Sequence, residues 1–224
     1  MIILGLTGSI GMGKSTASSM LQRMRIPIYD SDSSVHKVLS EKGEAVRQVG
    51  AVFPEVISNG SVDREALGKL VFKDRKALGV LESIIHPIIR NIQDNFLRCA
   101  AANRKRIVVL DIPLLFEVGL DTRCDATIVV SAPDFIQEAR VMSRPGMTAE
   151  KFKGIRERQM SNNEKCKRAT FIVPSNRGLG ETHKRLRVIL ELMKRECPNR
   201  WPPDHFLEQS VMKRRRNARN CFRY

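Results

Sequence analysis

Short apolar runs alternate with longer stretches of helical periodicity along most of the chain. Predicted strands occupy residues 2–7, 26–29, 106–110, 126–130 and 171–173. Predicted helices occupy residues 14–24, 33–39, 63–72, 74–102, 134–144, 148–160 and 181–195, and Pro87 is expected to break or kink the longest of them. This alternation indicates an α/β fold in which a parallel five-stranded sheet is flanked by helices.

The first predicted strand runs directly into the sequence Gly8-Ser-Ile-Gly-Met-Gly-Lys14-Ser15, which fits the pattern G-x-x-x-x-G-K-[ST]. Glycines let such a loop curl so that backbone N–H groups converge on phosphate oxygens, and the next helix points its positive end at the same anion. The Lys14 ammonium neutralises phosphate charge, and the Ser15 hydroxyl is a ligand for Mg²⁺. The pattern therefore predicts a site for a nucleoside triphosphate.

Two carboxylates, Asp30 and Asp32, follow the second predicted strand. Ligands of open α/β sheets bind at the carboxyl ends of the strands, where a carboxylate can accept the proton of an attacking hydroxyl. The alternative is that Asp32 or Ser33 caps the helix that follows. The residues alone favour neither reading.

Asp111 ends the third predicted strand in the same way, after four apolar residues. An acidic residue at this place is typical of the group that holds Mg²⁺ in phosphate-loop proteins, although it can also cap a turn. Four arginines flank the Pro145-Gly146 turn, where they either close over the phosphates or form a solvated helix face. They are Arg140, Arg144, Arg156 and Arg158.

Composition limits the remaining possibilities. The 224 residues carry a formal net charge of +15, which suits polyanionic ligands such as phosphates. The five cysteines have neither CxxC nor zinc-site spacing, no signal peptide is recognisable, and no apolar run is long enough to span a bilayer. A cytoplasmic protein that does not bind membranes is expected, while oligomeric state is left open.

Several segments, taken in order, resemble the dephospho-CoA kinase family. They read LTGSIGMGKST (6–16), YDSDSSVHKVL (29–39), VDREALGKLVF (62–72), LESIIHPIIR (81–90), DIPLLFEVGL (111–120) and RVMSRPGMT…RERQ (140–159). The phosphate loop is shared with many families, whereas the DIPLLFE and IHPI segments are specific. The resemblance extends from residue 2 to about 192.

The resemblance implies a P-loop nucleotide kinase-like core in residues 1–196. It also implies a helical acceptor-binding insertion at about 60–100 and a small helical lid at about 138–162. Residues 197–224 lose the apolar periodicity and gain a KRRR run, so a poorly ordered basic tail is expected there. The implied reaction transfers a phosphoryl group from ATP, with Mg²⁺, to the ribose 3′-hydroxyl of dephospho-CoA. This is the last step of coenzyme A synthesis.

The motif and the resemblance together assign site residues. Expected catalytic residues are Lys14, Asp32 as general base, and Arg140. Expected nucleotide contacts are Ser9, Ile10, Gly11, Met12, Gly13, Lys14, Ser15, Thr16, Arg144 and Asn176. Expected acceptor contacts are Thr7, Asp32, His86, Asp111 and Leu114, and expected Mg²⁺ ligands are Ser15 and Asp111. A basic acceptor contact of the family corresponds here to either His36 or Lys37.

Two other functions fit the residues. Another small-molecule or nucleotide kinase would share the phosphate loop and differ in residues 60–100. A nucleotide-gated nucleic-acid-binding protein would use the basic tail, but aromatic residues make up only 5% of the chain, which gives little sign of a base-stacking surface.

Overall fold

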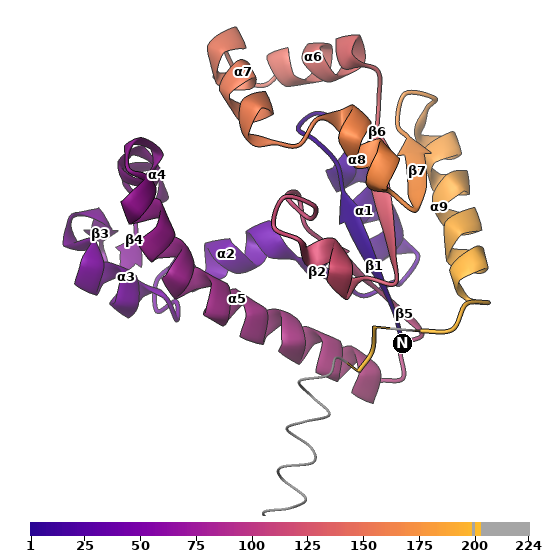
Figure 1. Cartoon of the computed structure of the whole chain (residues 1–224), viewed down its shortest axis with the longest axis horizontal. Coiled ribbons are helices and arrows are strands. Elements are labelled where there is room, and N and C mark those ends of the chain that lie inside the picture. Colours follow the sequence, from indigo (N-terminus) through magenta and orange to yellow (C-terminus); the bar gives the residue numbers. More distant parts are fainter. Residues whose placement is uncertain (199, 203–224) are drawn as a thin grey trace, which may run out of the picture.

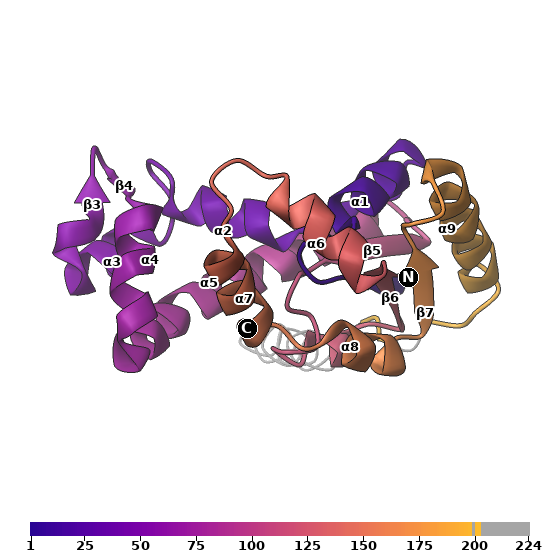
Figure 2. The ribbon, with the colours of Figure 1, turned by 90° about the horizontal axis from the view of Figure 1, so that it is seen from above.

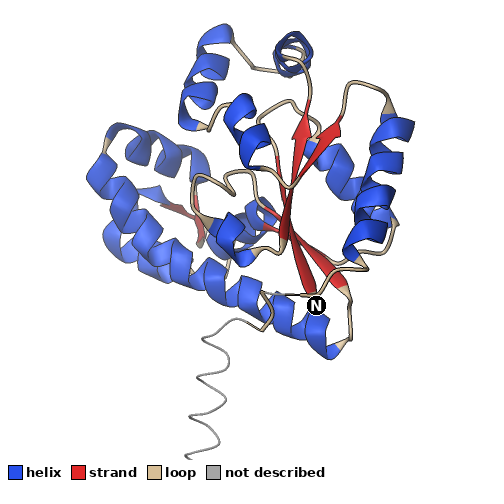
Figure 3. Cartoon of the chain, turned by 45° about the vertical axis from the view of Figure 1, so that its right-hand side comes forward, coloured by secondary structure: helices blue, strands red, loops and turns tan. Residues whose placement is uncertain are grey.

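The computed structural model describes residues 1–198 and 200–202 of the chain. Its centre is the predicted parallel sheet of five strands, in the order β2-β5-β1-β6-β7 (Figure 3). The strands are β1 (Ile2–Thr7), β2 (Ile28–Asp30), β5 (Ile107–Asp111), β6 (Ala126–Ser131) and β7 (Phe171–Pro174). The α/β fold predicted from the alternating pattern is therefore confirmed.

Both faces of the sheet are covered because successive side chains of a strand point to opposite faces. Ile2, Leu4 and Leu6 of β1 pack into one core cluster with α1 (Lys14–Arg23) and α9 (Leu179–Met193). Ile3 packs into another cluster with the C-terminal part of α5 (Arg75–Ala102). All six residues of β1 are buried, which explains its uninterrupted apolar sequence.

A separate cluster holds the insertion that extends to one side of the sheet (Figure 1). It joins α2 (Ser31–Leu39), α3 (Val46–Val52), the short strands β3 (Ile57–Ser58) and β4 (Ser61–Val62), α4 (Arg64–Lys73) and the N-terminal part of α5. Asp63 and Asp74 cap α4 and α5 by accepting bonds from backbone N–H groups of the first turn.

Helix α5 continues through Pro87 as one element of 28 residues, so the predicted break is absent. Proline removes one backbone hydrogen bond of the helix. The helix persists because Leu81, Ile85 and Ile88 are buried on both sides of the proline, in the cluster of the insertion. Packing thus outweighs the lost bond.

The remaining helices surround the carboxyl ends of the strands. They are α6 (Asp134–Met142), α7 (Ala149–Arg158) and α8 (Asn162–Arg168). Two 3₁₀ turns lie elsewhere: η1 (Pro54–Val56) joins α3 to β3 in the insertion, and η2 (Leu120–Arg123) precedes β6. Helices α6 and α7 lie beyond the carboxyl ends of the strands and α8 lies beside β6 (Figure 1). Seen from above, α7 lies on the side toward the insertion (Figure 2). Because these two helices lie mainly in the segment predicted to be a lid, we refer to α6 and α7 as the lid helices.

The chain after α9 returns to the core. The Arg200 N–H donates to Oδ1 of Asp125, and Trp201 packs against the cluster that contains Ile3. The prediction that the tail is poorly ordered falls mainly on residues 203–224, which lie outside the described residues. In the described part of the chain, no helix is both long and apolar enough to cross a membrane.

Candidate active site

The loop between β1 and α1 depends on two glycines with positive φ. Gly13, at φ 92°, caps α1, and a Cβ there would lie 3.1 Å from Cβ of Ser175. Gly11 has φ 75°, and its Cβ would lie 2.6 Å from a methyl group of Val141. Other residues rarely adopt this backbone, and neither position leaves room for a side chain. These constraints explain Gly13, which is a fixed glycine of the motif, and Gly11, which occupies one of its variable positions.

This loop borders a cavity of about 480 Å³, which we call the phosphate-loop cavity. Its lining brings together ten of the predicted residues: Ser9, Ile10, Gly11, Gly13, Lys14, Ser15, Thr16, Asp32, Arg140 and Arg144. The first turn of α1 opens on it. Free N–H groups and the helix dipole make such a helix start an anion site, so the cavity suits a chain of phosphates.

Lys14 and Asp111 form a close ion pair at the floor of the site, with 2.6 Å between Nζ and Oδ1. The Asp111 side chain is only 4% exposed, and the Lys14 side chain is 16% exposed. Asp111 stands at the end of β5, in register with Leu6 of β1 and Asp30 of β2. Because Asp111 supplies the counter-charge, the Lys14 ammonium group is held beside the loop and needs no second buried anion.

Asp32 lies in the first turn of α2 and lines the cavity. The cap of this helix is Asp30, whose Oδ1 accepts from the Ser33 N–H at 3.0 Å. The alternative that Asp32 or Ser33 is the cap is therefore wrong. Partial burial raises the pKa of the Asp32 carboxyl; nearby Lys14 lowers it, and the charges of Asp30 and Asp111 raise it further. A carboxylate with a raised pKa is a better proton acceptor.

Arg140 connects lid helix α6 to both walls of the cavity. Its NH1 and NH2 groups donate to Oγ and the carbonyl of Ser175, each at 2.8 Å, and NH1 lies 3.4 Å from the carbonyl of Gly11. Ser175 in turn donates to the Met12 carbonyl at 2.7 Å. The guanidinium is thereby fixed beside the phosphate loop.

The other arginines of the predicted lid separate into two groups. Arg144 lines the phosphate-loop cavity. Arg156 lies 3.9 Å from Asp134 and borders a neighbouring cavity of about 560 Å³, which shares Ser9 and Gln159 with the first. Arg158 is exposed and lines neither cavity. Only Arg140 and Arg144 thus stand where phosphates would lie.

Six predicted residues lie outside this lining: Thr7, Met12, His86, Asp111, Leu114 and Asn176. Thr7 and Met12 are buried; Thr7 donates to the Pro113 carbonyl at 2.8 Å, and the Met12 sulfur accepts from the Ala132 N–H. His86, Leu114 and Asn176 are exposed. Asp111 reaches the site through Lys14. The individual roles assigned to these residues remain predictions.

The sequence did not identify several residues that border the phosphate-loop cavity. They are Pro113, Gln159, Ser175, Leu179 and Thr182. Gln159 ends the RERQ segment and Ser175 precedes Asn176, so both lie in segments already noted. Their polar side chains gave no periodic signal, because only the fold brings them against the loop.

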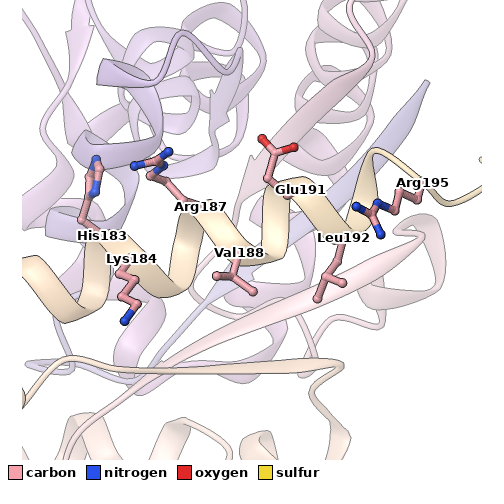
Figure 4. Close-up of a pocket in the computed structure, with 7 residues that line it drawn as sticks. All are labelled: His183, Lys184, Arg187, Val188, Glu191, Leu192 and Arg195. Atoms are coloured by element: carbon pink, nitrogen blue, oxygen red, sulfur yellow. The ribbon is translucent and has the colours of Figure 1, made fainter.

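A further depression, of about 350 Å³, is formed by side chains of α9 and by Arg195, two residues beyond its end (Figure 4). Its lining residues are His183, Lys184, Arg187, Val188, Glu191, Leu192 and Arg195. It shares no residue with the phosphate-loop cavity. We therefore place the candidate active site at the phosphate loop.

Comparisons with known proteins agree on one family. The family model described as dephospho-CoA kinase matches residues 2–181. A dephospho-CoA kinase from Paramagnetospirillum magneticum is 52% identical over 165 residues, covering 74% of this chain and 78% of the relative. One from Rhodospirillum rubrum is 46% identical over 202 residues, covering 89% and 95%.

Solved structures agree with the fold. The crystal structure titled TT1252 from Thermus thermophilus is 35% identical, with a TM-score of 0.76, over 85% of this chain and 97% of that chain. Dephospho-CoA kinase from Campylobacter jejuni, at 23% identity and a TM-score of 0.58 over 85% and 96%, supports the fold alone. The matched region contains the phosphate loop, Asp32, Asp111 and Arg140, and the chain belongs to the dephospho-CoA kinase family.

Proposed function

We propose that the chain transfers the γ-phosphoryl group of ATP to the ribose 3′-hydroxyl of dephospho-CoA, giving ADP and coenzyme A. The observation that carries this proposal is the arrangement of Lys14, Asp32 and Arg140 around one phosphate-loop cavity in a member of this family. One cavity is thus lined by a cation at the loop, a carboxylate from the first turn of α2 and a second cation from α6.

In this mechanism Asp32 orients the acceptor hydroxyl and accepts its proton as the phosphoryl group moves in line. Its carboxylate is free for this role because Asp30 caps α2. Lys14, held by Asp111, offsets charge on the β- and γ-phosphate oxygens. Most of the rate enhancement would come from positioning and from these fixed charges.

The residues also fit Mg²⁺. Among the described residues no group of three or more His, Cys, Asp or Glu could hold a metal ion by itself. Mg²⁺ commonly binds through one or two protein oxygens together with substrate phosphates and water. The Ser15 hydroxyl and the Asp111 carboxylate are suitable donors here, and the ion would neutralise phosphate charge when bound.

The direct test is turnover with a panel of acceptors. Purified protein is incubated with ATP and Mg²⁺, and ADP and coenzyme A are measured with dephospho-CoA, adenosine, AMP, shikimate or gluconate as acceptor. We expect rapid ADP release only in the reaction whose acceptor is dephospho-CoA. ATP binding without turnover of dephospho-CoA would refute the proposed reaction, and turnover of another acceptor would identify a different kinase.

Replacing Arg140 with lysine tests the lid. Lysine keeps the charge but lacks the planar fork that grips both oxygens of Ser175. We expect Arg140→Lys to lower kcat about ten- to a hundredfold, because the cation loses its fixed position. Arg168→Lys is the matched control, since Arg168 pairs with Asp121 away from the cavity and its loss should leave kcat unchanged. Equal kcat in the two variants would contradict the role.

The expected partners are ATP and dephospho-CoA, and we propose a cytoplasmic location because both substrates are soluble metabolites. No nucleic-acid role is proposed for the basic run Lys213–Arg216, which lies outside the described residues. Salt-dependent RNA binding that disappears on deleting residues 203–224 would assign such a role to the tail, without changing the reaction proposed for the core.

A further inference from the structure

A lysine with no exposed surface lies beneath the active site. Lys165 of α8 is 0% exposed, and its Nζ lies 2.9 Å from Oε1 of Glu117 and donates to the Pro113 carbonyl at 3.0 Å. Lysine is almost never fully buried unless it is paired, so this position needs a reason. Both of these polar contacts are with the segment that follows β5.

Glu117 extends the contact to the lid. The Oε1 atom that faces Lys165 also accepts from the Met160 N–H at 2.8 Å, whereas Oε2 is buried and has no hydrogen-bond partner. A buried ion pair with an unsatisfied oxygen is often no more stable than apolar side chains of similar size. Stability alone is therefore a poor explanation for the pair.

The segments joined by this pair are two borders of the phosphate-loop cavity. Pro113 lines the cavity, and its carbonyl also accepts from the Thr7 hydroxyl at the end of β1. Met160 directly follows Gln159, which lines the cavity from the end of the lid helices. The buried pair of Lys165 and Glu117 thus fixes the chain at two borders of the phosphate-loop cavity.

Gln159 transmits this position to the phosphate loop. Its Oε1 accepts from the Ile10 N–H at 3.1 Å, while Gln137 of α6 donates to the Ile10 carbonyl at 2.8 Å. The two peptide groups on either side of the Ile10 Cα are therefore each held by one lid side chain. A loop that is already oriented binds its ligand without a further ordering cost.

We propose that Lys165 is a positioning residue for ATP: through Glu117 and Met160 it holds Gln159 against Ile10 of the phosphate loop, and through Pro113 it holds the opposite wall. Lys165 touches neither substrate in this account. The inference rests on the proposed function in that the cavity binds ATP, but it does not depend on which acceptor is phosphorylated.

The first variant is Lys165→Met, which keeps the length of the side chain and removes its charge. We expect the Kd for ATP, measured by calorimetry with ATP alone, to rise about ten- to a hundredfold because the loop loses its fixed geometry. Arg123→Met is the matched control. Arg123 forms another buried pair, 2.5 Å from Asp94, that ties α5 to η2 and lines no part of the cavity. Its loss should lower the melting temperature but leave the Kd unchanged.

A second variant separates position from stability. Glu117→Leu combined with Lys165→Met replaces the buried charges with apolar groups, so the melting temperature should return toward that of wild type. The Kd for ATP should stay raised, because the Met160 N–H loses Glu117 and the Pro113 carbonyl loses Lys165 while keeping the Thr7 hydroxyl. If Lys165→Met alone does not fold, the Kd for ATP is measured with the paired variant instead. A wild-type Kd in the paired variant would overturn the proposal.

A double-mutant cycle identifies the route. If Lys165 acts through Gln159, Gln159→Ala and Lys165→Met should each raise the Kd, and the combined variant should be no worse than the weaker-binding single variant. Independent, multiplying effects would overturn the route. Wild-type protein that binds ATP but does not phosphorylate dephospho-CoA would refute the proposed reaction and leave this binding test intact.

Discussion

Asp32→Asn is expected to lower kcat about a hundred- to ten-thousandfold while changing the KM for ATP little. Asparagine has nearly the same shape but cannot accept the proton of the acceptor hydroxyl, and general bases contribute about this factor. The expectation depends on Asp32 facing the phosphate-loop cavity while Asp30 caps the helix. Steady-state kinetics with dephospho-CoA measures both constants.

Asp30→Asn is the matched control, because asparagine caps a helix about as well as aspartate. Its kcat should stay within a few-fold of wild type.

The stability of Asp32→Asn gives a second readout. The folded state raises the pKa of Asp32 above its unfolded value, so the folded protein favours the protonated carboxyl, and stability falls as pH rises through that range. Asp32→Asn should therefore not lower the melting temperature at neutral pH. A near-normal kcat of Asp32→Asn would show that Asp32 is not the general base.

The same pKa shift predicts how activity depends on pH. Wild-type kcat should decrease on the acid side as Asp32 becomes protonated, with a midpoint above the usual range of an aspartate. The remaining activity of Asp32→Asn should lack this decrease. A pH series of initial rates at saturating substrates measures it, and an unchanged acid limb in the variant would assign the limb to another group.

The parts of the fold that the sequence predicted are those with a strong apolar pattern. Each of the five strands of the sheet is largely apolar, and all were anticipated within a few residues. Helix α8 was missed because its sequence NNEKCKR has no apolar stripe, and the side chain it buries is that of Lys165. The β3–β4 hairpin was also missed, although the Asn59-Gly60 turn, with both φ angles positive, is a known hairpin signal.

The residues of the site likewise differ in whether a local sequence pattern could predict them. The phosphate loop was predictable because its chemistry is contained in eight consecutive positions with fixed residue types. The cap of α2 was not, since Asp30 and Asp32 are both plausible until the geometry of the first turn is known. Gln159 and Ser175 are far from the loop in sequence, and only tertiary packing makes their contacts with Ile10 and Met12.

Lys14→Ala is expected to have the larger effect of the two central substitutions, lowering kcat/KM for ATP by at least about a thousandfold. A single fixed donor at developing charge contributes on the order of this factor, and Lys14 also contributes to nucleotide binding. The substitution should also destabilise the fold by about 3–5 kcal/mol, because it leaves the Asp111 carboxylate buried without its partner. Kinetics and thermal unfolding measure the two effects separately.

The variant Lys14→Ala with Asp111→Asn distinguishes loss of the catalytic cation from loss of the folded state. Removing the second charge relieves the unpaired carboxylate, so much of the lost stability should return. Activity should not return, because Arg140, which also lies beside the loop, is held in place by Ser175 and does not replace Nζ. Recovery of kcat/KM together with stability would mean that Lys14 supports the fold rather than the phosphates. Recovery of stability alone would assign Lys14 to the transition state and Asp111 to its position.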